Sequence, residues 1–129
     1  MPFLLDTNIA VDLLSDVQRT IERVSAIDGQ FLSVISRVEL EAGVYRDGSL
    51  DANRRARLDT LLDRVAELDF TSREVAAYTS IIAAKGFSRR LIVDRMIAAT
   101  AVANSLTLAT LNPRDFRGIP GLAIEDWSI

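Results

Sequence analysis

Four acidic residues occupy positions where strands and helices could bring them together. Asp6 follows a short apolar run, Glu39 lies just past a second run, Asp94 opens an alanine-rich segment, and Asp115 follows a third run. Carboxylates within a few ångströms of one another repel strongly unless protons or cations intervene. A bound divalent cation would neutralise this repulsion. A carboxylate-held Mg²⁺ can lower the pKa of a bound water and stabilise charge on a phosphoryl oxygen, which is the chemistry of phosphodiester hydrolysis.

The composition restricts the metal and excludes several classes of site. The 129 residues include no histidine and no cysteine. This excludes a structural zinc site, a Ser-His-Asp triad, a cysteine nucleophile, histidine-ligated haem and a disulfide framework. Any metal must be bound by oxygen, which favours the hard cations Mg²⁺, Mn²⁺ or Ca²⁺.

The charge balance argues at first against a nucleic-acid ligand. Eighteen acidic residues against fifteen basic ones give a net charge of −3, whereas nucleic-acid binders usually carry a basic surface. Without the four candidate ligands, fourteen acids remain against fifteen bases. The excess negative charge therefore coincides with the predicted metal site, where a divalent ion would offset it.

Short apolar runs alternate with helical patterns along the chain. Strands are expected at 3–5, 31–35, 67–70, 106–110 and 122–124, and helices at 9–14, 17–27, 36–46, 51–66, 72–85 and 93–105. This alternation is typical of an α/β domain with a mostly parallel sheet covered on both faces, here a single domain over 1–129. Sites in such sheets form at the carboxyl ends of strands, so the four carboxylates are expected to meet at one edge.

The sequence also predicts where the protein resides. The N-terminus has no basic region and reaches Asp6 before an apolar signal segment could form, so no signal peptide is expected. Apolar runs such as 96–103 are too short to span a membrane. We therefore expect a cytoplasmic protein.

Each candidate carboxylate also has a purely structural interpretation. The tripeptide 6–8 could cap the first helix, and 36–39 matches the capping box [ST]-x-x-E. Asp94 could cap the alanine-rich helix, and Asp115 could be a turn residue. The set of four is more specific than any one of them.

Taken together, four segments of the chain resemble the successive motifs of PIN domains. They are Leu4-Leu5-Asp6-Thr7-Asn8, Leu32 to Leu40 with Gly43, Asp94 to Ala101, and Leu108 to Phe116. The likeness spans Leu4 to Trp127 and extends to the VapC-type toxins of bacterial toxin–antitoxin pairs.

The resemblance implies a fold, an activity and partners. The family has a three-layer α/β/α sandwich, Mg²⁺- or Mn²⁺-dependent endoribonuclease activity, a homodimeric state and inhibition by a cognate antitoxin. The antitoxin's C-terminal segment crosses the active-site groove, often with a basic side chain facing the carboxylates. By the same resemblance Asp6 and Asp94 bind the metal, and Glu39 and Asp115 match the third and fourth acidic positions.

Further residues are implicated less directly. The resemblance also implies that four polar residues orient a carboxylate or a water: Asn8, Ser36, Thr110 and Asn112. Arg89, Arg90 and Arg95 flank Asp94 and could contact RNA phosphates, or could be ordinary surface arginines.

Two other classes of function can be weighed against the nuclease: a binding module and a protein that forms an aspartyl phosphate. A catalytically silent PIN fold that binds RNA or a partner would keep the same residues without turnover. An aspartyl-phosphate phosphatase usually needs Asp-x-Asp after its first strand, but position 8 is Asn. A response-regulator receiver needs a lysine after its fifth strand, but the sole lysine, Lys85, ends a helix.

Overall fold

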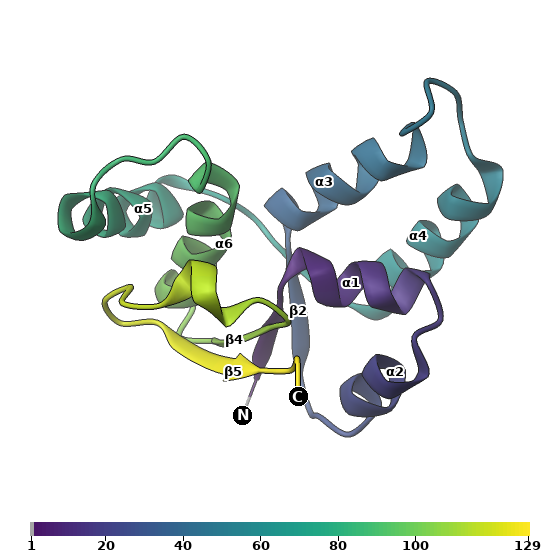
Figure 1. Cartoon of the computed structure of the whole chain (residues 1–129), viewed down its shortest axis with the longest axis horizontal. Helices are drawn as coiled ribbons and strands as arrows, with labels where there is room; N and C mark the ends of the chain where they lie inside the picture. The colour runs from purple at the N-terminus through teal and green to yellow at the C-terminus, as the bar shows by residue number, and fades with distance from the viewer. Residues whose placement is uncertain (1) are drawn as a thin grey trace.

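A five-stranded parallel sheet forms the centre of the molecule (Figure 1). The computed structural model describes residues 2–129. The strand order is β3-β2-β1-β4-β5, and each neighbouring pair is parallel. The strands are β1 (Phe3–Leu5), β2 (Gln30–Ser33), β3 (Ala66–Leu68), β4 (Thr107–Thr110) and β5 (Ala123–Asp126). The predicted parallel α/β sheet is confirmed.

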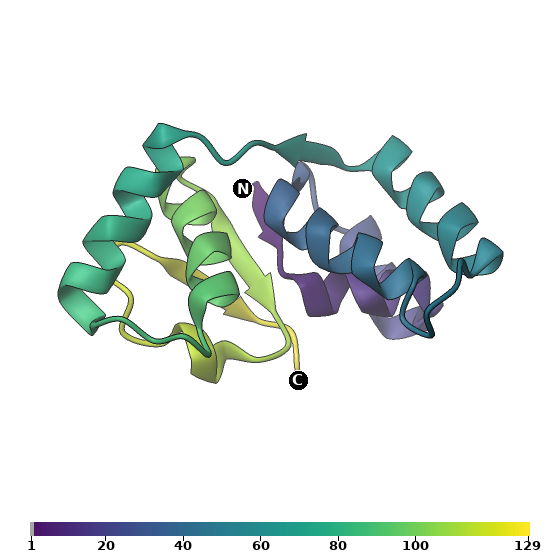
Figure 2. The ribbon, with the colours of Figure 1, turned by 90° about the horizontal axis from the view of Figure 1, so that it is seen from above.

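Helices cover both faces of this sheet (Figures 1 and 2). They are α1 (Thr7–Leu14), α2 (Gln18–Ser25), α3 (Val34–Val44), α4 (Ala52–Arg64), α5 (Ser72–Lys85) and α6 (Ile92–Ala103), with a 3₁₀ turn, η1, at Pro113–Phe116. From β1 the chain adds β2 and then β3 on one side of the sheet, and it then crosses back to add β4 and β5 on the other side of β1. Because crossovers are right-handed, the reversal places α5 and α6 opposite α1 to α4. The result is the expected three-layer sandwich.

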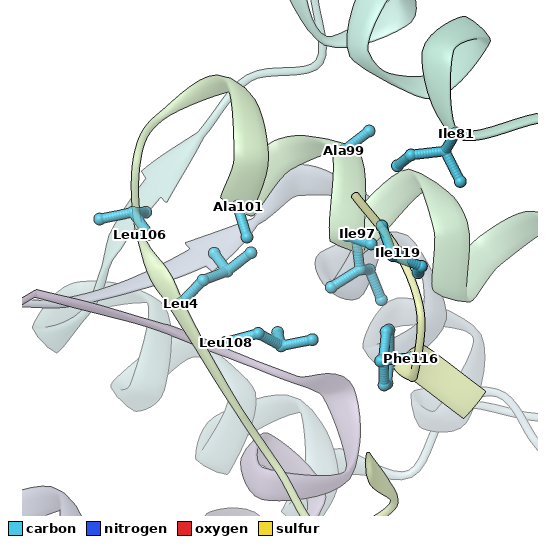
Figure 3. Packing of buried hydrophobic residues seen from close by; sticks show 10 residues of the cluster. Leu4, Ile81, Ile97, Ala99, Ala101, Leu106, Leu108, Phe116 and Ile119 are labelled. Atoms are coloured by element: carbon cyan, nitrogen blue, oxygen red, sulfur yellow. The ribbon is translucent and has the colours of Figure 1, made fainter. Parts of the chain in front are cut away.

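The central strands are apolar on both sides, as a sheet between two helical layers requires. Leu4 and Leu108 are fully buried and pack with Ile97 and Phe116 on the α5–α6 side (Figure 3). Phe3 and Leu5 belong to a separate cluster on the other face. Alternate residues of β1 therefore hold the two outer layers in place.

Of the predicted elements, β1 and α5 have the predicted bounds, and the others differ by one or two residues at one or both ends. α3 begins at Val34 rather than at Ser36, because Ser33 at the end of β2 caps the helix by accepting from the Ile35 amide at 3.0 Å. β3 is Ala66–Leu68, shifted by one residue from the expected 67–70 and shorter. β5 continues to Asp126, and beyond it the amide of the buried Trp127 donates to the Thr110 carbonyl at 2.8 Å.

None of the helices in residues 2–129 has both the length and the apolar character needed to cross a membrane.

The core makes a direct stability prediction. Leu4→Ala should lower the free energy of unfolding by about 2–5 kcal/mol, because it opens a cavity between the sheet and α6 that the rigid surroundings cannot fill. Leu50→Ala is the matched control, since Leu50 is 52% exposed in the loop before α4. Urea denaturation measures both variants. Equal stabilities for the two would contradict the packing described for β1.

Candidate active site

The reversal in strand order creates a crevice at the carboxyl ends of β1 and β4. Leu5 of β1 pairs with Ala109 of β4, and the Asp6 amide extends this ladder by donating to the Ala109 carbonyl at 2.9 Å. Asp6 and Thr110 therefore lie side by side at the edge of the sheet. Ligands of open α/β sheets bind at such a switch point.

Asp6 is held by hydrogen bonds to both carboxylate oxygens. Its side chain is buried, with Oδ1 accepting from the Thr7 amide at 2.8 Å and Oδ2 accepting from the Thr110 hydroxyl at 2.7 Å. The first contact caps α1, so the capping interpretation holds. It does not compete with a role in a site, because the cap fixes the direction in which the carboxylate faces.

Glu39 is positioned by a residue from another helix. The Thr7 hydroxyl donates to Glu39 Oε1 at 2.6 Å and lies 2.8 Å from the hydroxyl of Ser36, which is fully buried. The alternative of a capping box at 36–39 is wrong, because Ser33 caps α3. Thr7 was not singled out from the sequence, where only its place beside Asp6 could have drawn attention to it.

Asp94 and Asp115 approach from the other side of the crevice. Asp94 lies in the first turn of α6, and the alternative that it caps this helix is wrong, because the cap position is Leu91. Asp115 lies in η1, where its Oδ2 accepts from the Asn112 side-chain amide at 2.8 Å. The Asn112 backbone amide in turn donates to the Thr110 hydroxyl at 3.0 Å, which links η1 to the Asp6 side of the site.

Three of the four carboxylates line a single cavity of about 270 Å³. Its lining residues are Asp6, Thr7, Asn8, Val11, Glu39, Asp94, Asn112 and Phe116. Asp115 is not among them, while Ser36 and Thr110 lie behind the lining and contact Thr7 and Asp6. Asn8 accepts from the Leu111 amide at 3.3 Å. Within residues 2–129, no three acidic side chains are gathered closely enough to ligate one ion together.

Comparison with known proteins places this arrangement in a family. The model of the PIN domain family matches residues 3–122. The chain belongs to the PIN domain family. The resemblance inferred from the four sequence motifs is thereby confirmed.

Relatives of this PIN domain carry related names. It is 29% identical to Ribonuclease VapC2 of Rickettsia felis, with 98% of each chain covered. It is 30% identical to the tRNA(fMet)-specific endonuclease VapC of Salmonella typhimurium, again with 98% of each covered.

Solved structures show the same fold. VapBC2 from Rickettsia felis bound to a promoter DNA fragment matches with a TM-score of 0.85 at 26% identity, covering 98% of this chain and 99% of that one. DNA-bound VapBC from Salmonella typhimurium matches with a TM-score of 0.84 at 29% identity, covering 98% of both.

The crowded carboxylates of the PIN domain perturb each other's ionisation. Burial raises the pKa of Asp6, although hydrogen bonds from Thr110 and Thr7 oppose the shift. Burial, followed by the negative charges of Asp6, Asp115 and Glu39, raises the pKa of Asp94 to about 6. Arg90 opposes this shift. A site that resists ionisation in this way would be stabilised by a bound cation.

The three arginines around Asp94 have different environments. Arg90 is exposed, with Nη1 3.6 Å from Asp115 Oδ1, and Arg89 is also exposed. The prediction that Arg95 contacts RNA is wrong. Its side chain is buried and donates to the Gly86 carbonyl, because successive helical residues face different directions and Arg95 faces the turn between α5 and α6. Arg95 therefore ties this turn to α6.

The raised pKa of Asp94 predicts a stability effect in metal-free protein. Asp94→Asn should raise the free energy of unfolding by about 1–2 kcal/mol near pH 7.5, because it removes a partly screened charge that the fold disfavours. The folded chain binds the Asp94 proton more tightly than the unfolded chain. The gain should therefore appear above the folded pKa of about 6 and vanish as the pH falls toward the ordinary value of 3.8.

Urea denaturation in EDTA across this pH range measures the effect. Asp63→Asn, at an exposed position on α4, is the control and should change little. If Asp94→Asn were as stable as the parent, or less stable, at neutral pH, the carboxylates would not repel one another as described.

Proposed function

We propose that this PIN domain is a divalent-metal-dependent endoribonuclease and the toxin of a type II toxin–antitoxin pair. The observation that carries the proposal is the convergence of Asp6, Glu39 and Asp94 on one cavity at the switch point of the sheet. The ribonuclease and tRNA endonuclease names of relatives over nearly the whole chain support an RNA substrate.

The donor set suits Mg²⁺ or Mn²⁺. All candidate ligands are carboxylate oxygens, and the sequence has no histidine or cysteine to recruit a softer metal. Since no three acidic side chains in the described residues are arranged around one point, direct ligation would come from one or two of them. Mg²⁺ is commonly bound in this way, with water completing its shell. Asp6 and Asp94 are the proposed ligands, supported by Glu39 and Asp115.

Different residues of the chain would have different roles in hydrolysis. A bound cation supplies a water of lowered pKa and offsets charge on the phosphate. Thr110 and Thr7 hold Asp6 and Glu39 in fixed positions, and Asn112 orients Asp115. Arg90 is exposed beside Asp115 and is placed to bind a phosphate oxygen of the substrate. Attack by such a water would form one P–O bond, break the bond to the leaving ribose oxygen and deliver a proton to that oxygen, without a covalent protein intermediate.

The proposed partner is a cognate antitoxin. Two of the similar solved structures are VapBC assemblies, and a third is a toxin–antitoxin complex from Klebsiella pneumoniae with a TM-score of 0.74 at 25% identity. The homodimer and the single domain over 1–129 stay predictions from the sequence. An RNA substrate would place the activity in the cytoplasm.

Substitution of the proposed ligands tests the activity. Asp6→Asn and Asp94→Asn should each lower Mg²⁺-dependent RNA cleavage by about 100-fold or more, because each removes a charge needed to hold the cation. At subsaturating Mg²⁺, cleavage by the parent should fall as the pH drops below about 6, because protonation of Asp94 competes with binding of the cation. Gel assays on total RNA in Mg²⁺ or Mn²⁺ measure both effects.

Asp63→Asn is the matched control for these variants and should cleave like the parent. Variants at Asp6 or Asp94 that cleave as fast as the parent would refute the assignment of ligands. A parent chain that cleaves no RNA yet binds its antitoxin would instead identify a catalytically silent binding module.

The contact between Thr7 and Glu39 makes a finer prediction. Thr7→Val keeps the shape but removes the hydroxyl, and should weaken Mn²⁺ binding about tenfold, because outer-shell partners fix the orientation of metal ligands. Thr7→Ser keeps the hydroxyl and should restore most of the affinity. Mn²⁺ titration by electron paramagnetic resonance compares the variants. Equal affinity in Thr7→Val and the parent would mean that this hydrogen bond does not position Glu39 for the metal.

A further inference from the structure

A second, larger cavity adjoins the acidic one. It has a volume of about 410 Å³ and lies among α1, α3 and the start of α4. Thr7, Val11 and Glu39 line both cavities. The two cavities therefore adjoin at these residues, and Asp94 lines only the acidic one. We call this second cavity the α3–α4 groove.

Arginines gather along the α3–α4 groove. Arg46, Arg54 and Arg57 line it together with the acidic residues Glu39 and Asp51. The acidic cavity, in contrast, has three carboxylates and no basic residue in its lining. The lining is thus negative in the acidic cavity and net positive in the adjoining α3–α4 groove.

Two of these guanidinium groups are accessible to a new anion. Arg46 is exposed and forms no ion pair within residues 2–129. Within residues 2–129, Arg54 forms an ion pair only with Asp51, at 3.4 Å, and the two side chains are 43% and 45% exposed. An ion pair this exposed contributes little, so a phosphate can replace it. Arg57 is more firmly engaged, because it donates to Asp16 at 2.6 Å and to the Leu14 carbonyl at 2.9 Å.

We propose that the α3–α4 groove binds the backbone of the RNA strand on one side of the cleaved phosphate, with Arg46 and Arg54 as its phosphate ligands. The inference rests on the proposed endoribonuclease activity. Charge complementarity carries it, because an RNA strand is a polyanion and guanidinium groups bind phosphate in bidentate fashion. Because Glu39 lines both cavities, a strand bound in the groove would lie next to the carboxylates of the site.

Another cavity fits an apolar partner segment better. It has a volume of about 460 Å³, lies among α1, α2 and α4, and has more aliphatic lining, including Leu13, Ile21, Val24 and Val65. It shares no lining residue with the acidic cavity. This cavity adjoins the α3–α4 groove at Leu14 and Arg57 but does not reach the carboxylates. Of the two, the α3–α4 groove therefore suits a strand that must pass the carboxylates.

The RNA path then crosses the carboxylates between two sets of arginines. Arg90 lies beside Asp115 on one side, and Arg46 and Arg54 lie beyond Glu39 on the other. In Figure 1 the turn between α5 and α6 and the α3–α4 pair stand on opposite sides of the sheet edge. This places a single strand across the site and explains how a chain with a net charge of −3 can hold RNA.

Replacement of both arginines tests the proposal. Arg46→Gln/Arg54→Gln should raise the KM for RNA cleavage about tenfold or more and leave kcat within about twofold, because the lost contacts bind the strand without touching the reacting atoms. In the cleavage-deficient Asp6→Asn background with Mg²⁺, the same pair should weaken binding of a labelled single-stranded RNA. The slope of log affinity against log salt should fall by about one to two. Fluorescence anisotropy measures this slope.

Arg19→Gln is the matched control, since Arg19 is exposed on α2 and lines none of the cavities described. It should leave KM and the salt slope unchanged. The proposal would be overturned if the parent cleaves RNA and the double variant has the same KM and salt slope as Arg19→Gln. It would also be overturned if the double variant loses antitoxin binding but binds RNA like the parent, because the groove would then bind the protein partner. Absence of cleavage by the parent would instead count against the proposed function itself.

Discussion

Asp6, Glu39 and Asp94 face one small cavity, and burial together with their mutual repulsion raises the pKa of Asp94 to about 6. The fold holds these charges together by fixing each one from a separate element. Both oxygens of Asp6 accept hydrogen bonds, and the carboxylate stands at the N-terminus of α1, where the helix dipole favours negative charge. Glu39 is held from α1 through Thr7. The repulsion that remains is what a divalent cation would relieve.

The position of the site follows from the topology. Right-handed crossovers place α1 to α4 on one face, and the reversal after β3 places α5 and α6 on the other. The reversal leaves β1 and β4 as neighbours, followed by α1 and by η1 respectively, and η1 packs on the α6 side. Asp6 and Thr110 end these two strands, and Asp94 reaches them from the start of α6. The apolar, doubly covered core supplies a rigid frame, so that ligands from distant parts of the sequence keep fixed relative positions.

Local signals made part of this structure predictable. The bounds of α5 follow from its own sequence, because Thr71 and Glu74 form a capping box at one end and Gly86, with φ of +81°, ends the other. The contact between Thr7 and Glu39 depends instead on how α1 packs against α3. The burial of Arg95 depends on which face of α6 meets the α5–α6 turn, and the groove arginines come together only when α3 and α4 pack. The spacing of residues along the sequence does not show which helix faces meet, so these three contacts could not be predicted from it.

We propose that the carboxylate cavity is a metal centre. Anomalous diffraction from crystals of the protein soaked in Mn²⁺ near neutral pH tests it most directly. We expect a manganese peak in the cavity lined by Asp6, Glu39 and Asp94, and we expect it to disappear in crystals of Asp94→Asn. A peak that appears only elsewhere, or none in this cavity under conditions in which the protein cleaves RNA, would contradict it.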